Sequence, residues 1–265
     1  MGCEMGVLGV GHLASALLDG VFKHGVLSPE QVLLSDHVPA QLDRFAAMGC
    51  TIASSNADLK TAPRILLAVR PQSFKDAASS LGDLSNEQLV ISVMAGLDSS
   101  TIQQALGGAC RVVRAMPNTG ATFGASMTCL ATGSGGNEED LQWTTNLFNS
   151  IGTTAKIDES LMSAATAVCG SGPGWIYLLA SAMVAGARDV GFDEERSQAM
   201  VRQVLRGASL VMDNTSSDLD MLLDSIASAG GTTEAGLDVM RSKGFEEAVR
   251  AGIIAARDRG EELSG

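Results

Sequence analysis

The feature that most limits the fold is a series of short apolar runs without polar alternation in residues 1–158. Ile65–Val69, with the sequence Ile-Leu-Leu-Ala-Val, is one of these runs. A strand needs this pattern when helices cover both faces of its sheet, as they do in parallel sheets. Amphipathic segments such as Leu13–Lys23 separate the runs. This alternation of strands and helices predicts a doubly wound α/β sheet.

Seven strands are expected in this part of the chain. They are Glu4–Leu8, Val32–Ser35, Ile65–Val69, Leu89–Val93, Arg111–Ala115, Ser126–Ala131 and Thr153–Ile157. Helices are expected between the first strands, at Leu13–Lys23 and Val38–Met48.

The composition changes after residue 158. All six prolines lie at or before Pro173, and the residues beyond it have the pattern of helices separated by glycine or polar turns. The expected helices are Gly174–Val190, Glu194–Met212, Asp218–Ile226, Thr232–Arg241 and Phe245–Arg259. We therefore expect an α/β domain at residues 1–158 and an all-α domain at residues 159–265, with a frayed tail at residues 261–265.

Charge and composition exclude several classes of protein. The formal net charge of −12 argues against nucleic acid or an anionic membrane as the main partner. The five cysteines are scattered and form no CxxC pair, which is typical of buried thiols in a reducing compartment. Because His12, His24 and His37 lack the spacing of metal ligands, no metal site is expected.

Ser160–Ala187 is a long stretch without charge. Gly170–Gly174 interrupts it, and the roughly 13 helical residues that follow are too few to span a bilayer. An apolar helix of an interface in a dimer explains the stretch better, and Tyr177 is expected in its core. Since no basic segment precedes an apolar stretch at the N-terminus, a cytoplasmic location is expected.

A G-x-G-x-x-A pattern directly follows the first expected strand and begins the first helix, with Gly9 and Gly11 in the turn and His12 and Leu13 after it. Glycine is needed where a Cβ would collide with the turn or with a pyrophosphate, which the helix N-terminus attracts. This context predicts a Rossmann-type dinucleotide site. Asp36 can accept a hydrogen bond from a ribose hydroxyl of NAD, whereas Ser35 and His37 can contact the 2′-phosphate of NADP, so both cofactors stay open.

Three later strand ends point to the same crevice, because ligands bind outside the carboxyl ends of parallel strands. The third strand ends in Ala68, Val69, Arg70 and Pro71, the fourth is followed by Ala95 and Gly96, and the fifth by Asn118. A surface salt bridge would explain Arg70 equally well. A role in forming the turn would explain Asn118 equally well.

A second candidate loop joins two helices of the C-terminal part and contains Ser228, Gly230, Gly231, Thr232 and Thr233. Exposed N–H groups and two hydroxyls before a helix make a good anion site. The alternative is that Thr232 simply caps the next helix.

The helical part lacks the usual groups for acid–base work at neutral pH. No lysine lies between Lys156 and Lys243, and no histidine follows His37. Oxidation of an alcohol requires a base, whereas reduction of a protonated imine requires mainly hydride delivery, orientation and an anion clamp. The available residues fit imine reduction better.

These motifs, in order along nearly the whole chain, resemble those of the pyrroline-5-carboxylate reductase family. The matching segments are Gly9–Ala14, Asn56, Ala68–Gln72, Ala95–Leu97, Val113–Thr119, Gly170–Pro173 and Gly230–Thr233. Met-Pro-Asn-Thr, at Met116–Thr119, and Gly-Gly-Thr-Thr, at Gly230–Thr233, are the specific blocks.

The resemblance implies a Rossmann domain, a helical dimerisation domain and NADPH- or NADH-dependent reduction of 1-pyrroline-5-carboxylate to L-proline. It places the nicotinamide near Asn56, Ala68–Gln72 and Ala95-Gly96, and the substrate carboxylate at Ser228–Thr233, with Thr233 reaching the ring nitrogen. It also implies a homodimer whose helices interleave, with a larger ring of dimers as an open alternative.

The chain departs from the family pattern at several positions. His12, Leu13 and His37 replace the usual Asn, Met and Arg, and Cys169 replaces a Ser. Gly120 and Ala229 replace prolines, which loosens two loops. Two other functions stay open: a hydroxyacid or imino-acid dehydrogenase, and a non-catalytic dinucleotide-binding regulator. A hydroxyacid dehydrogenase would need a lysine early in the helical domain.

Overall fold

The computed structural model describes residues 2–264, and the chain divides into two compact units. The first comprises Met1–Ser171 with Ile254–Gly265, and the second comprises Gly172–Ile253. The predicted boundary after residue 158 differs from this division because the first helical turns after it, up to Ser171, pack with the sheet.

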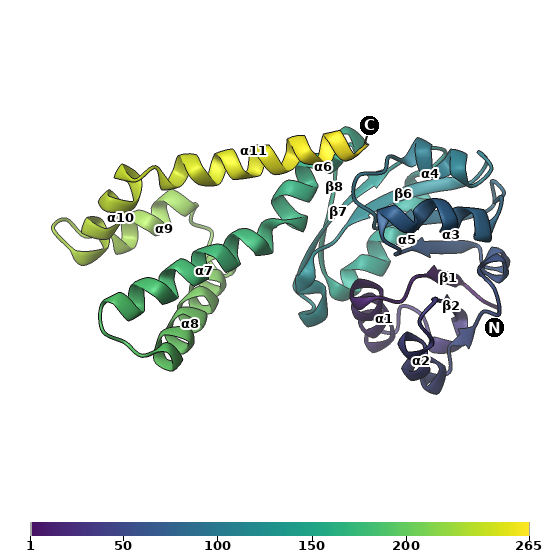
Figure 1. Cartoon of the computed structure of the whole chain (residues 1–265), viewed down its shortest axis with the longest axis horizontal. Coiled ribbons are helices and arrows are strands. Elements are labelled where there is room, and N and C mark those ends of the chain that lie inside the picture. The colour runs from purple at the N-terminus through teal and green to yellow at the C-terminus, as the bar shows by residue number, and fades with distance from the viewer. Residues whose placement is uncertain (1, 265) are drawn as a thin grey trace. The chain divides into compact units, whose positions relative to one another are not determined.

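The first unit is built on an eight-stranded sheet with the order β3-β2-β1-β4-β5-β6-β7-β8 (Figure 1). Its strands are β1 (Met5–Leu8), β2 (Val32–Ser35), β3 (Thr51–Ile52), β4 (Arg64–Leu67), β5 (Leu89–Ser92), β6 (Arg111–Met116), β7 (Ser126–Thr132) and β8 (Gly152–Lys156). All seven expected strands are present, and β3 is an additional one. Strands β1 to β6 are parallel, which confirms the doubly wound α/β prediction.

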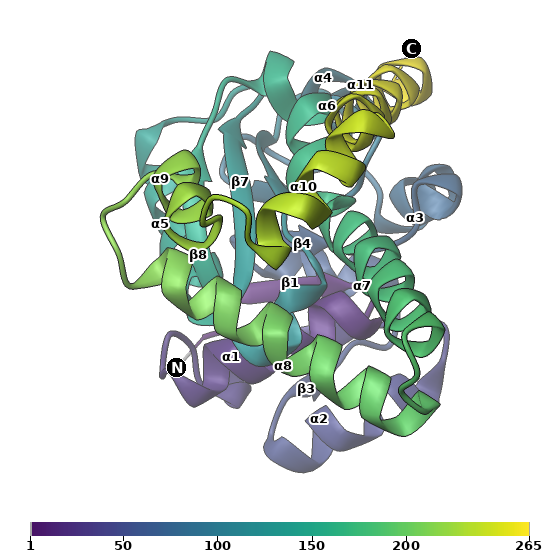
Figure 2. The same ribbon diagram turned by 90° about the vertical axis from the view of Figure 1, so that its left-hand side faces the viewer.

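The last two strands depart from the expected parallel sheet. β7 pairs antiparallel with β6, and β8 pairs parallel with β7 at the edge of the sheet (Figure 2). A short connection after β6, with the 3₁₀ turn η5 (Thr119–Phe123), turns the chain back directly. A parallel pair would need a longer crossover there.

Helices cover both faces of the sheet. They are α1 (His12–Lys23), α2 (Asp43–Met48), α3 (Phe74–Leu81), α4 (Ser99–Ala105), α5 (Glu138–Phe148) and α6 (Met162–Ala165). One core cluster joins the sheet to α1, α2 and α5, and a second joins it to α3 and α4. The expected helix Val38–Met48 is instead the 3₁₀ turn η2 (Pro39–Gln41) and the short α2.

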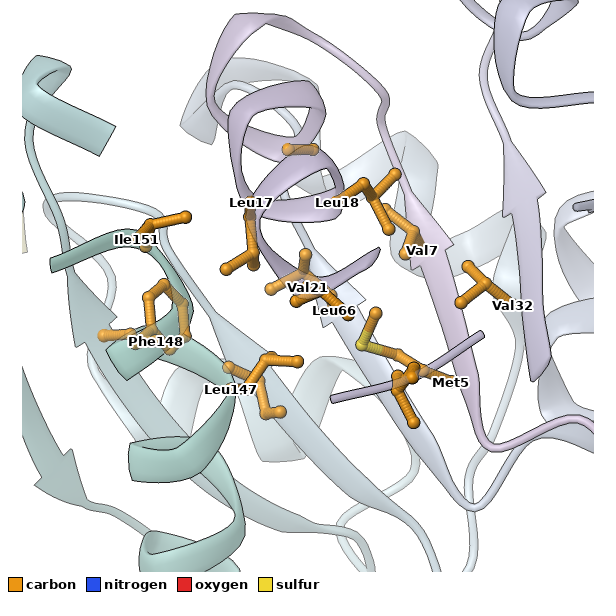
Figure 3. Close-up of a cluster of buried hydrophobic side chains, with 14 of the residues drawn as sticks. Met5, Val7, Leu17, Leu18, Val21, Val32, Leu66, Leu147, Phe148 and Ile151 are labelled. Carbon is orange, nitrogen blue, oxygen red and sulfur yellow. The ribbon is translucent and has the colours of Figure 1, made fainter. Parts of the chain in front are cut away.

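The larger cluster fixes the helix that begins at the glycine turn. Leu17, Leu18 and Val21 of α1 are buried against the strands, and Phe148 closes the cluster from the end of α5 (Figure 3). Val21 follows Leu17 by four residues and Leu18 by three, which places the three side chains on one face of α1. The packing therefore holds the N-terminus of α1 at the carboxyl end of β1.

The second unit is helical, as expected, and contains α7 (Gly172–Asp189), α8 (Glu194–Asp213), α9 (Leu219–Ile226), α10 (Thr232–Ser242) and the first part of α11 (Phe245–Ser264). α7 and α8 form a hairpin (Figure 1). Gly170–Gly174 does not interrupt the helix as expected. Instead only Ser171 separates the π turn η8 (Thr166–Gly170) from α7, whose early Pro173 fits a first helical turn.

The helical run Glu159–Asp189 is, by length and composition alone, long and apolar enough to cross a membrane. The expectation that it is too short was therefore wrong, because the glycines do not break it. No residue of α7 is buried in the single chain, and Tyr177 is 64% exposed there, so its expected place in the core of a dimer interface stays a prediction. This run therefore presents exposed apolar side chains in the single chain, among them Ile176 and Leu178.

Candidate active site

The glycine turn after β1 is shaped by close backbone contact. Gly9 has φ +93°, and a Cβ on it would lie 2.8 Å from the carbonyl oxygen of Ala68 and 3.1 Å from Cγ1 of Val69. The end of β4 is thus pressed against the turn, and a residue with a side chain does not fit. Gly9, Ala68 and Val69, all expected at the cofactor site, lie together.

The next glycine faces open space. Gly11 is the N-cap residue of α1, no side chain caps the helix there, and a Cβ on Gly11 would meet no atom within 4 Å. The first N–H groups of a helix, here beginning at His12 and Leu13, lack acceptors within the helix. With the helix dipole they favour an anion, so this cradle fits the pyrophosphate of a dinucleotide.

Asp36 supports the glycine turn from the end of β2. Its Oδ2 accepts a hydrogen bond from the Val10 N–H at 2.6 Å, its Oδ1 accepts one from the Val38 N–H at 2.8 Å, and its side chain is 8% exposed. Nδ1 of His37 is 3.4 Å from Oδ1 of Asp36, but the His37 side chain is 94% exposed. Asp36 therefore holds the glycine turn in place, and the exposed imidazole of His37 lies next to it.

Ser35 and Asn56 meet beside Asp36. The Ser35 hydroxyl donates to Oδ1 of Asn56 at 2.5 Å, and Nδ2 of Asn56 donates to the Ser80 hydroxyl at 2.7 Å. Asn56 begins the 3₁₀ turn η3 (Asn56–Thr61), which packs under α3. The structure thus brings together Ser35, Asp36, His37 and Asn56 at the carboxyl end of β2.

Arg70 follows β4 and caps the 3₁₀ turn η4 (Pro71–Ser73), which Pro71 begins. Its side chain is exposed, and within residues 2–264 it takes part in no ion pair. The alternative of a surface salt bridge is therefore not observed. An uncompensated cation beside the glycine turn suits a phosphate-bearing ligand.

Ala95 and Gly96 form the loop after β5, and the end of the chain packs on it. Gly96 has φ +71°, and a Cβ on it would lie 3.0 Å from Cβ of Leu263. A Cβ on Gly260 would lie 3.2 Å from Cβ of Ser163. Because of these contacts α11 continues to Ser264, so the expectation of a frayed tail was wrong for residues 261–264, and Gly265 lies outside the described residues.

Asn118 forms the turn after β6, which is one of the two roles that the sequence suggests for it. Its Oδ1 accepts from the Gly120 N–H at 2.9 Å and caps η5, while its Nδ2 donates to the Cys169 carbonyl at 3.2 Å. Its own N–H donates to the Ser126 hydroxyl at 3.1 Å. Asn118 therefore connects the end of β6 to η8 through a hydrogen bond.

A buried charge pair lies nearby that sequence reasoning missed. The guanidinium of Arg114, in β6, is 3.5 Å from Oε1 of Glu159, and its Nε is buried without a hydrogen-bond partner. Glu159 also accepts from the Ser99 N–H at 2.8 Å and from the Ser99 hydroxyl at 2.6 Å. Burial lowers the pKa of Arg114, and the Glu159 carboxylate opposes that shift. The one available signal was an arginine inside an apolar strand.

Replacing Glu159 with glutamine is expected to lower the free energy of unfolding by about 1–3 kcal/mol, because Arg114 then stays charged and buried without its carboxylate. Urea unfolding measures the change. Glu138→Gln is the matched control, since its carboxylate pairs with Lys156 on the surface and is 75% exposed. The control is expected to lose no more than about 1 kcal/mol. Equal losses in the two variants would contradict this account of Arg114.

In the second unit, the loop Ser228–Thr233 leads into α10. Gly231 is the N-cap residue without a side-chain cap, so the alternative in which Thr232 caps the helix is wrong. Gly230 has φ +72°, and its N–H donates to Oε2 of Glu234 at 2.7 Å. The Gly231 N–H donates to the Ser228 carbonyl at 2.9 Å. Thr232 and Thr233 are therefore the first two helical residues, as an anion site requires.

The α7–α8 hairpin carries a groove of about 580 Å³ within the second unit. Apolar side chains such as Ile176, Val184 and Leu205 line it, together with Arg188 and Glu194. Within residues 2–264, no group of three or more His, Cys, Asp or Glu residues is placed to hold a metal ion.

The fold and the glycine cradle define a dinucleotide-dependent oxidoreductase, and family models agree. Residues 4–96 match the model "NADP oxidoreductase coenzyme F420-dependent", and residues 159–263 match "Pyrroline-5-carboxylate reductase dimerisation". A pyrroline-5-carboxylate reductase of Methanosarcina acetivorans is 34% identical over 98% of this chain and 97% of its own length. The chain belongs to the pyrroline-5-carboxylate reductase family, which confirms the resemblance seen in the sequence.

Other relatives agree over the full length. The pyrroline-5-carboxylate reductase of Pisum sativum is 31% identical over 98% of this chain and 96% of its own length. The solved structure of the Coxiella burnetii reductase has a TM-score of 0.91 at 27% identity and covers 99% of both chains. The Plasmodium falciparum enzyme, solved with NADP bound, has the same fold, with a TM-score of 0.86 at 24% identity over 99% of this chain and 98% of its own.

Proposed function

We propose that this protein reduces 1-pyrroline-5-carboxylate to L-proline with NADPH or NADH. The observation that carries the proposal is the full-length match to family reductases, with the glycine turn and the Gly-Gly-Thr-Thr loop both intact. Both loops precede a helix whose N-terminus has no side-chain cap. One such loop suits a pyrophosphate and the other a carboxylate.

The cofactor residues stay those of the sequence prediction. The pyrophosphate would be held by Gly9, Gly11, His12 and Leu13, and the adenosine side by Ser35, Asp36 and His37. The nicotinamide side would be held by Asn56, Ala68, Val69, Arg70, Pro71, Ala95, Gly96 and Asn118. The open space at Gly11 and the unpaired Arg70 support this assignment. When bound, the reduced nicotinamide supplies a hydride.

The substrate residues are Ser228, Gly230, Gly231, Thr232 and Thr233. The N–H groups at the start of α10 would fix the carboxylate, and the hydroxyl of Thr233 would hold the proton on the ring nitrogen. An already protonated imine needs no strong base, in agreement with the absence of lysine and histidine from residues 157–242. This absence also disfavours a hydroxyacid dehydrogenase.

A homodimer would cover the apolar face of α7 and complete the site with the partner's loop. The dimerisation model includes this helix, which supports a protein partner rather than a membrane. A cytoplasmic location belongs to the proposal as well, and a ring of dimers stays an open alternative to the single dimer. Sedimentation equilibrium at several protein concentrations measures the size of the assembly.

The activity is tested by mixing purified protein with the five-membered imine acid and NADPH or NADH. The absorbance of the reduced nicotinamide is expected to fall, and proline to accumulate in equal amount. The six-membered imine acid tests ring size. Cofactor binding without turnover of either imine, at any pH, would instead support a regulatory dinucleotide-binding protein.

Replacing His37 with arginine is expected to raise the ratio of kcat/KM for NADPH to that for NADH by roughly three- to tenfold. A permanent cation at this exposed position would pair with the 2′-phosphate, which NADH lacks. His24→Arg adds the same charge at the far end of α1 and is the control. An equal change in both variants, or an effect that added salt does not weaken, would count against a phosphate at this position.

A further inference from the structure

Two free cysteines face each other between strand β7 and the π turn η8. Sγ of Cys129, in β7, is 3.7 Å from Sγ of Cys169, in η8. Cys129 is 5% exposed, and Cys169 is partly exposed. The two thiols are far apart in the sequence, so only the fold brings them together. Their separation needs to shrink by roughly 1.7 Å to form a disulfide bond.

The pair is connected to two loops that the proposed function uses. Cys129 lies in a small core cluster that Ala95 and Cys169 pack against. Cys129 is also the pairing partner of Met116, two residues before Asn118. Cys169 accepts the hydrogen bond from Nδ2 of Asn118 through its carbonyl. A movement of Cys169 therefore changes the hydrogen bond that Asn118 makes.

The two sides of the pair differ in freedom to move. β7 is held between β6 and β8 by strand pairing on both sides. η8 is a single π turn, a rare helical form that is frequent at functional positions. Closure of the bond would therefore shift η8 toward β7. The Asn118–Cys169 hydrogen bond, already 3.2 Å long, would be weakened or lost.

The two thiols also differ in reactivity. Burial, followed by the hydrogen bond with Cys169, raises the pKa of Cys129 to about 11. Cys129 is therefore a thiol at neutral pH, and the more exposed Cys169 meets an oxidant first.

We propose that Cys129 and Cys169 form a reversible dithiol–disulfide site, oxidised by a small disulfide of the glutathione class, whose closure slows catalysis through Asn118. The thiolate of Cys169 attacks one sulfur of the small disulfide, whose S–S bond breaks and releases one thiol. Cys129 then loses its proton to solvent and attacks the Cys169 sulfur, and the second small thiol leaves. Two protein thiols are oxidised and one small disulfide is reduced to two thiols.

The bond is tested on the full-length protein equilibrated in mixtures of oxidised and reduced glutathione. Free thiols are expected to fall from five to three, and mass spectrometry of the unreduced digest is expected to find one peptide pair joined through Cys129 and Cys169. Cys169→Ser should keep its four thiols, whereas Cys3→Ser should still form the cross-link. Unchanged thiols, or a cross-link between other cysteines, would overturn the proposal.

The consequence for catalysis rests on the proposed function and is measured separately. Reduction of the imine is expected to slow at least threefold as the cross-link forms, and to recover with dithiothreitol, in the wild type and in Cys3→Ser but not in Cys169→Ser. A complete cross-link with unchanged activity would overturn the link through Asn118. If the protein turns over no imine at all, the proposed function fails. NADPH affinity, measured by protein fluorescence before and after cross-linking, then still shows whether the disulfide bond changes the cofactor loops.

Discussion

Replacing Gly9 with alanine is expected to lower the free energy of unfolding by about 2–5 kcal/mol and to abolish cofactor binding. Two effects add: a φ of +93° strains any residue with a Cβ, and the new methyl would lie 2.8 Å from the Ala68 carbonyl oxygen. The end of β4 must move away to relieve this overlap, and the nucleotide crevice would lose its shape. Urea unfolding and NADPH titration measure the two effects.

Gly11→Ala separates ligand binding from folding in the same turn. A methyl on Gly11 meets no protein atom within 4 Å, so the free energy of unfolding is expected to change by less than about 1 kcal/mol. NADPH binding should nevertheless weaken by roughly tenfold or more, because the methyl occupies the space proposed for the pyrophosphate. Undiminished NADPH binding by Gly11→Ala would place the pyrophosphate elsewhere.

The strands were predictable because burial on both faces leaves a continuous apolar run. Ile65, Leu66 and Leu67 are each at most 1% exposed, as that pattern requires. β3 escaped prediction because its two residues, Thr51 and Ile52, are exposed and too few to form a pattern. The antiparallel direction of β7 could not be predicted either, because an apolar run indicates that a strand is buried but not in which direction it pairs.

The parts of the site that the sequence missed depend on residues distant in the chain. The glycine turn and the Gly-Gly-Thr-Thr loop are local, so their residues identified them. Asp36 bonding to Val10, Arg114 facing Glu159, and Leu263 packing on Gly96 each join segments brought together only by folding. No local propensity contains this information, and the expectation of a frayed C-terminal tail failed for the same reason.

Thr233→Val is expected to lower kcat/KM for the imine by roughly 5- to 150-fold, which corresponds to about 1–3 kcal/mol of transition-state stabilisation. Thr233 is the second residue of α10, is partly exposed, and within residues 2–264 its hydroxyl has no hydrogen-bond partner. Valine keeps the shape and removes only the hydroxyl. Loss of a bond to the ring nitrogen would appear in kcat, because the positive charge there changes as the hydride is transferred.

Thr233→Ser keeps the hydroxyl and is expected to retain most of the activity. Thr232→Val is a further comparison: a hydroxyl that serves only the carboxylate binds substrate and transition state alike, so its loss should raise KM and leave kcat nearly unchanged. Neither substitution disturbs a cap, because Gly231 is the N-cap residue and no side chain caps α10. An unchanged kcat/KM in Thr233→Val would remove Thr233 from the mechanism and leave the N–H groups of α10 as the anchor of the substrate.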